Sequence, residues 1–237
     1  MNDALSADRG AASEAHWIPL SDLMTGLMVM FLLIAVCYMV EVEADADKIK
    51  TVAVAYNDTR DALYEALRSE FSPDLPQWHA QLIKQDLTIR FSEPEILFAE
   101  GSSELKPAFK QILDDFFPRY ARILTSPQFR SAISEVRIEG HTSSGWVGAR
   151  SADDAYLHNM ELSQARTRST LLYVLALPRL RGDVDWLRRF VTANGLSSSR
   201  PIIDASGHED AARSRRVEFK IRTDAETRIA KILEVAH

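Results

Sequence analysis

Asp22 is the residue of this chain with the clearest chemical potential, because it lies inside an apolar stretch of membrane-spanning length. The stretch covers residues 18–40, and residues 23–40 carry no charge. At about 1.5 Å per residue it would span roughly 34 Å, enough to cross the hydrocarbon core of about 30 Å. A carboxyl group placed there is costly to ionise and can take up and release a proton. Asp22 is therefore a predicted proton carrier.

Two features of the same stretch leave alternatives open. Ser21 or Asp22 could instead cap a helix that begins at Leu23 and sit at the membrane interface. Thr25 and Gly26 would let a partner helix approach closely, although the same small residues also serve ordinary helix packing. One helix with one carboxylate cannot enclose a proton path, so a proton carrier here requires further membrane helices from a multi-span partner.

Arg166 is the candidate ligand-binding residue of the remaining chain. Asn159 is expected to cap the helix that contains Arg166, which would place the guanidinium about two turns along. Helix N-terminal amides and an Arg fork together suit a carboxylate. The alternative is that Asn159 is only a cap and Arg166 forms a surface ion pair. Arg213, Arg215 and Arg216 precede the last predicted strand, where they could contact a ligand or form ion pairs at the strand edge.

Composition excludes several classes of function. The chain has 237 residues with 46% hydrophobic and 26% charged content, which is typical of a globular protein. A net charge of −6 gives no electrostatic footprint for nucleic acid. Cys37 is the single cysteine, and the six histidines show neither helical i, i+4 pairs nor Cys/His spacing, so we expect no zinc site. No hydrolase or NTPase motif occurs, and no cofactor is expected.

The elements around Asp22 are predicted from the same pattern. Residues 1–16 form a polar tail, residues 17–40 a transmembrane helix and residues 41–76 a linker helix, which Pro73 and Pro76 end. The long apolar run and the acidic tail favour a retained anchor over a cleavable signal peptide. The linker helix carries a heptad-like seam: Ile49, Val52, Tyr56, Thr59, Leu63 and Ala66. This seam either pairs with a second copy of the chain or lies on its own domain.

Residues 77–237 are predicted to form one domain in which strands alternate with helices. The predicted strands are residues 87–91, 136–140 and 217–221. One helix is predicted to begin at Pro107, and Pro118 is expected to kink or break it. Three further helices are predicted at residues 161–177, 183–193 and 224–236. A long polar loop is expected at residues 142–159. Without a Gly-rich phosphate loop, this order indicates a small α/β sandwich.

Two regions resemble known families. Residues 21–28 resemble the membrane segment of the B subunits of proton-driven stator motors. Residues 85–222 resemble the OmpA-like peptidoglycan-binding domain of the MotB type, through four stretches in family order: residues 98–107, 138–142, 159–166 and 213–218. Among such B subunits, the chain is most similar to those of Zorya antiphage defence systems, on the residues that enter and leave the membrane segment. Flagellar B subunits usually carry a basic tail, and the first 16 residues are not basic.

The resemblance implies a single transmembrane helix followed by an OmpA-like domain. It further implies a homodimer surrounded by five multi-span A-type subunits, in which proton flow drives rotation and the chain is not an enzyme. The N-terminus would be cytoplasmic and the C-terminal domain periplasmic, at the bacterial inner membrane. The distribution of Lys and Arg around the span does not set this orientation, which rests on the resemblance. A flagellar stator subunit and a passive envelope anchor are the alternatives.

The same resemblance implies a peptidoglycan site. The family uses the Asn and Arg that match Asn159 and Arg166 to hold the free carboxylate of diaminopimelate. The predicted ligand-binding residues are Thr142, Ser143, Asn159, Arg166 and Arg216. Ser143 stands where the family has an Asp that holds the amine, and a hydroxyl is the weaker partner for an ammonium group. Either Asp153 or Asp154 could take over this role.

Overall fold

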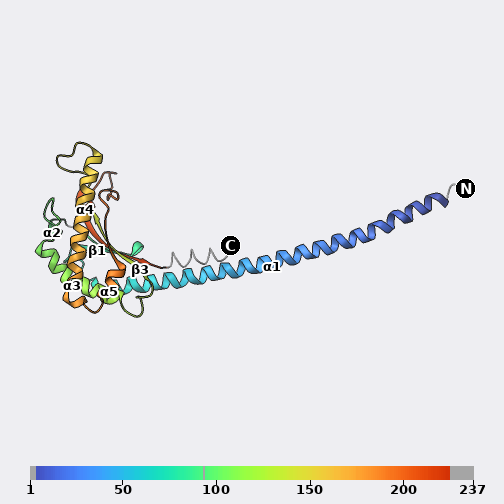
Figure 1. Ribbon diagram of the computed structural model, residues 1–237, viewed down its shortest axis with the longest axis horizontal. Helices are drawn as coiled ribbons and strands as arrows, with labels where there is room; N and C mark the ends of the chain where they lie inside the picture. Colours follow the sequence, from blue (N-terminus) through green and yellow to red (C-terminus); the bar gives the residue numbers. More distant parts are fainter. Residues whose placement is uncertain (1–3, 93, 225–237) are drawn as a thin grey trace. The chain divides into compact units, whose positions relative to one another are not determined.

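The computed structural model describes residues 4–92 and 94–224 (Figure 1). In chain order, the elements are α1 (Ala4–Phe71), β1 (Ala80–Ile83), η1 (Lys84–Asp86), β2 (Thr88–Phe91), α2 (Pro94–Leu97), α3 (Pro107–Leu124), β3 (Ile133–His141), α4 (Ala152–Leu175), η2 (Pro178–Leu180), α5 (Val184–Phe190), β4 (Val191–Gly195), α6 (Ala211–Ser214) and β5 (Arg216–Thr223). The predicted closing helix at residues 224–236 lies almost entirely outside the described residues. The predicted fold class, one apolar helix beside an α/β domain, is confirmed.

The N-terminal unit of the chain, which ends near residue 53, is helical. Within α1, the segment Leu20–Lys48 is long and apolar enough to span a membrane, by length and composition. Its large hydrophobic side chains are exposed around the helix. Because α1 begins at Ala4, Asp22 lies inside a continuous helix. The alternative in which Ser21 or Asp22 caps a helix that begins at Leu23 is therefore wrong.

The second unit, Val54–Ala230, begins within α1, because the end of this helix contributes to the core. Leu63, Leu67 and Phe71 recur every four residues on one face, and none is more than 1% exposed. An ion pair also joins α3 to the end of α1, because Arg119 Nε lies 2.8 Å from Glu70 Oε1. At Leu63, the predicted seam thus lies on its own domain and is not available to a second copy.

The domain is built on one five-stranded sheet with the order β1-β2-β5-β3-β4. All neighbouring strands are antiparallel except β3 and β4, which are parallel. The three predicted strands correspond to β2, β3 and β5. Aromatic side chains of α3 pack on the sheet, with Phe116 and Phe219 of β5 at 5.1 Å between ring centroids.

Several predictions in this domain are wrong, among them the polar loop at residues 142–159, because α4 already begins at Ala152. Residues 191–193 belong to β4 and not to a helix, since α5 ends at Phe190. Gly195 ends β4, where a Cβ atom would lie 2.3 Å from the backbone nitrogen of Gln164 in α4. The glycine therefore permits the close approach of α4 to the sheet. Pro118 does not break α3, which continues to Leu124.

Candidate functional site

A cleft of about 930 Å³ opens on the domain where the end of β3, the start of α4 and the segment before α3 meet. It is lined by Phe98, Glu100, Gly101, Lys106, Thr142, Ser143, Gly145, Trp146, Val147, Asn159, Leu162, Arg166 and Arg215. Four of the five predicted ligand-binding residues line it, namely Thr142, Ser143, Asn159 and Arg166. The fold thus brings together these four predicted residues, which lie up to 24 positions apart in the sequence, from Thr142 to Arg166.

Asn159 has a different local role from the one predicted. Helix α4 begins at Ala152, and its cap is Ser151, whose side chain accepts a hydrogen bond from the Asp154 amide. Asn159 lies two turns further along and is 3% exposed. Its Nδ2 donates to the carbonyl of Gly145 at 3.2 Å, so this side chain holds the loop that closes one wall of the cleft. The prediction that Asn159 caps the helix is therefore wrong.

Arg166 is held in the cleft by backbone carbonyls. Its Nε donates to the Ser102 carbonyl at 2.8 Å and a terminal nitrogen donates to that of Ala99 at 3.2 Å. The guanidinium also lies over the ring of Phe98, 4.9 Å from its centroid. Burial, with a smaller contribution from nearby Arg215, lowers the pKa of Arg166 to about 10. Among the described residues no carboxylate pairs with it, so the alternative in which Arg166 forms a surface ion pair is wrong.

The acidic group of the cleft is Glu100, which sequence reasoning did not single out. Asp153 and Asp154 do not line the cleft. Asp154 instead accepts a hydrogen bond from the Arg150 amide at 2.9 Å and lies 3.3 Å from His158. The signal for Glu100 was present, because this residue belongs to the family stretch at residues 98–107.

The loop between β3 and α4 forms the remaining wall. Its Trp146 stacks on His158 of α4, with the ring centroids 5.2 Å apart and the planes at 16°. The Ser144 amide donates to Glu209 at 3.1 Å, which ties the loop to the segment before α6. The next residue after Trp146, Val147, is 94% exposed. The cleft therefore combines three cations (Lys106, Arg166 and Arg215) with one carboxylate and an aromatic wall.

Arg216 lies apart from the cleft lining. It is 6% exposed, and its Nε donates to Glu218 Oε1 at 2.6 Å. Burial lowers the pKa of Arg216, although the hydrogen bond to Glu218 opposes this effect. The ion-pair alternative therefore describes Arg216, whereas its neighbour Arg215 lines the cleft.

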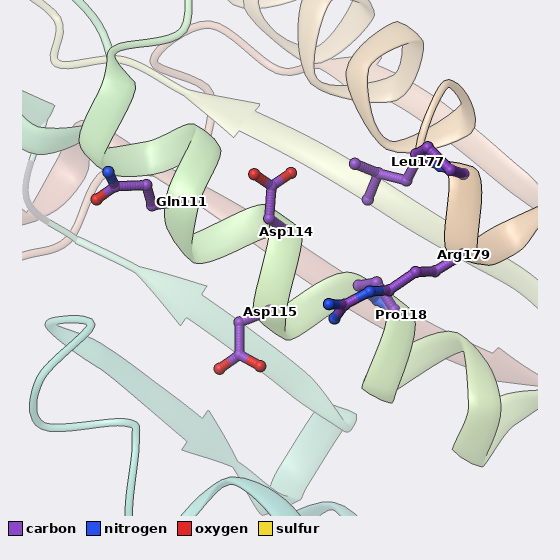
Figure 2. Close-up of a pocket in the computed structure, with 7 residues that line it drawn as sticks. Gln111, Asp114, Asp115, Pro118, Leu177 and Arg179 are labelled. Atoms are coloured by element: carbon purple, nitrogen blue, oxygen red, sulfur yellow. The ribbon is translucent and has the colours of Figure 1, made fainter.

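Another hollow, of about 530 Å³, lies between α3 and the chain that follows α4. Figure 2 shows Arg179 extending toward Pro118 of α3, while Asp114 and Asp115 lie about one turn earlier on the same helix. The Tyr173 hydroxyl donates to Asp114 at 2.7 Å. None of the predicted site residues lines this hollow.

Asp22 belongs to the N-terminal unit, and its side chain is exposed on α1. One turn on, the Thr25 hydroxyl donates to the Ser21 carbonyl at 2.8 Å, so this polar group is satisfied within the helix. The cleft and Asp22 are thus two separate sites of the chain.

Comparison with known proteins places these features in a family. The chain is 49% identical over 219 residues to the Zorya protein ZorB of Escherichia coli (strain ATCC 8739), an alignment that covers 92% of each chain. No protein-family model matches.

A solved structure shares the fold of the domain. A MotB-like protein from Desulfovibrio vulgaris is 26% identical with a TM-score of 0.50, over 73% of this chain and 94% of that one. The periplasmic domain of Helicobacter pylori MotB is 15% identical with a TM-score of 0.43, over 65% and 88% of the two chains. The identity and coverage shared with the curated relative show that this chain belongs to the ZorB family of Zorya proteins.

Proposed function

We propose that the chain is the B subunit of a proton-driven rotary motor of the bacterial inner membrane. This motor serves antiphage defence, and its B subunit is anchored to peptidoglycan. The observation that carries the proposal is a carboxyl group, Asp22, inside the apolar segment of α1. Membership of the ZorB family supports the defence role, and likeness to a MotB-like protein supports the stator role.

The membrane part of the proposal follows from the side chains that α1 exposes. Residues 23–36 expose large apolar side chains around the helix, which suits lipid and neighbouring membrane helices. A single acid in that segment is costly unless it faces protein or water, so intramembrane acids are commonly functional. Asp22 alternates between protonated and ionised forms as the surrounding subunits move.

The wall-binding part rests on the charges of the cleft. Arg166, Lys106 and Arg215 suit a carboxylate, and Glu100 suits an amine. A diaminopimelate stem peptide carries both groups on one side chain. We therefore assign the cleft to the stem peptide, with Arg166 on its carboxylate. Glu100 then supplies the negative charge that Ser143 lacks.

One helix cannot enclose a proton path, so the proposed motor needs multi-span partner subunits. The resemblance to stator motors implies two copies of the chain among five such A-type subunits. The N-terminal tail is cytoplasmic and the domain periplasmic, which places the cleft beside the cell wall.

Substitution of Asp22 tests the proposal in cells. In bacteria that carry the complete defence system, Asp22→Asn removes the titratable proton with almost no change in shape. We expect it to abolish protection in a phage plaque assay while the protein remains in the membrane at its normal level. Asp58→Asn, also on α1 but exposed in the domain unit, is the matched control and should protect normally.

Full protection by Asp22→Asn would contradict the motor. The chain would then be a passive anchor that fastens the membrane to the wall, and Arg166→Ala would be the more harmful substitution.

A further inference from the structure

Three titratable side chains come together on one face of the sheet, where β3 pairs with β5. Glu139 and His141 lie two residues apart on β3 and therefore point to the same face. Glu218 of β5 lies opposite Glu139 in the register of the two strands. Their exposed fractions are 2%, 3% and 4%. The backbone pairing thus fixes two carboxylates and one imidazole in a closed space.

These groups face one another without hydrogen bonds. His141 Nε2 lies 3.8 Å from Glu139 Oε2 and 3.7 Å from Glu218 Oε2, beyond the usual range of about 2.7–3.2 Å. Among the described residues, neither ring nitrogen of His141 nor Glu139 Oε2 has a hydrogen-bond partner. Buried polar atoms without partners are rare in folded proteins because they have lost their hydration. These buried polar atoms are therefore available to a bound group that would satisfy them.

We propose that Glu139, His141 and Glu218 bind a divalent metal ion of the zinc class. One ligand atom from each residue lies within 4.8 Å of the others. Atoms spaced in this way can each lie roughly 2.1–2.4 Å from a common point, close to zinc–nitrogen and zinc–oxygen bonds of about 2.0–2.2 Å. One imidazole and two carboxylates are a ligand set that zinc accepts, with water in the fourth position.

Two arginines orient the Glu218 carboxylate by donating hydrogen bonds to Oε1, the oxygen that does not face His141. The Nε atoms of Arg90 and Arg216 donate to Glu218 Oε1 at 2.8 and 2.6 Å, which leaves Oε2 facing His141. Such outer contacts commonly orient metal ligands. The same cations reduce the negative charge of the site, so we expect weaker binding than at a site without them.

The metal would also brace the cleft. His141 ends β3, and the next two residues, Thr142 and Ser143, line the cleft. An ion that joins β3 to β5 at this point would hold the start of the loop in place.

Metal analysis of the full chain tests the proposal. The protein is purified in detergent without a His tag, stripped with a chelator, loaded with Zn²⁺ alone and desalted. We expect about one zinc per wild-type chain by mass spectrometry and a higher Tm after loading. His141→Gln and Glu139→Gln should each lower the affinity by roughly tenfold or more. His158→Ala, which removes an exposed histidine of α4, should bind as the wild type does.

Cobalt provides a readout that does not depend on the variants. Co²⁺ loaded into the wild-type chain should give visible absorption bands of a low-coordinate site, even if a variant fails to fold. Wild-type protein that retains no zinc and gives no such bands would overturn the proposal. Equal zinc retention by a folded His141→Gln variant would do so too, and the cluster would then be an ion-pair network around buried water.

Discussion

Arg166 owes its position to main-chain carbonyls and an aromatic ring rather than to another charged side chain. The two carbonyls come from Ala99 and Ser102, whose segment also carries Glu100 into the cleft. The same guanidinium therefore fixes one wall of the cleft and presents its charge to a ligand. Two of its five N–H groups are used in this way, which leaves donors for a carboxylate.

Substitution of Arg166 should separate charge from geometry. Arg166→Ala removes the fork, and Arg166→Lys keeps the charge but cannot form paired hydrogen bonds to a carboxylate. We expect both variants to lose most of their retention on purified peptidoglycan, by roughly tenfold. Arg168→Ala, an exposed residue two positions along α4, should be retained like the wild type.

Retention of Arg166→Ala equal to that of the wild type would reject the assignment of this residue. Thermal unfolding of each variant shows whether a loss of binding comes from a loss of folding.

Single residues were predictable where a family motif contained them, and were missed where strand register brings them together. Four of the five predicted cleft residues share one site. Glu139 and His141 form an i, i+2 pair that belongs to a strand, whereas the metal-ligand patterns that stand out in a sequence are helical i, i+4 and Cys/His spacings. Glu218 joins them only through the pairing of β3 with β5. That pairing joins residues 79 positions apart and has no local signal.

At the scale of elements, helix α1 serves two environments. Its apolar segment Leu20–Lys48 exposes its side chains, whereas Leu63, Leu67 and Phe71 are buried in the domain core. The predicted pairing seam at residues 49–66 therefore cannot act as one continuous surface. We propose that pairing with a second copy is restricted to the part that precedes Leu63.

Cysteine cross-linking should locate the paired part. In a Cys37→Ser background, Ile49→Cys lies on the predicted seam and should form a disulfide-linked dimer in membranes. Leu63→Cys should remain monomeric under oxidation, because the side chain at this position is 1% exposed. Cross-linking at residue 63 without cross-linking at residue 49 would contradict this division of α1.

Truncation of Leu67 should show that the end of α1 belongs to the domain. Leu67→Ala leaves a cavity in the core and should lower the free energy of unfolding by about 2–5 kcal/mol. Glu65→Ala, an exposed change two residues away, should alter it by less than about 0.5 kcal/mol. Thermal or denaturant unfolding measures both, and an unaffected Leu67→Ala variant would mean that the helix end does not pack as described.

Elements with strong local patterns were predictable, and those set by packing were not. Strands β2, β3 and β5 show apolar alternation. The segment Val191–Gly195 continues the helical pattern of α5, but it pairs in parallel with β3 and became a strand. The start of α4 had a readable signal in Ser151, followed by Asp153 and Asp154 in the first turn.

At the scale of the whole molecule, one chain carries an acid within an apolar helical segment and a cationic cleft, in separate units. In the proposed motor, the chain must be fixed to the wall before proton flow can exert torque on a partner. Loss of either site should therefore abolish the same function, but by different routes. Arg166 variants should still conduct protons, whereas Asp22 variants should still bind the wall.

Proton flux tests the central claim most directly. The chain and its multi-span partner are reconstituted in vesicles that contain a pH-sensitive dye, and an inward proton gradient is imposed. The account predicts acidification with the wild-type chain and a rate at least about tenfold lower, near that of empty vesicles, with Asp22→Asn. Equal rates for the two chains would contradict the assignment of Asp22 as the proton carrier.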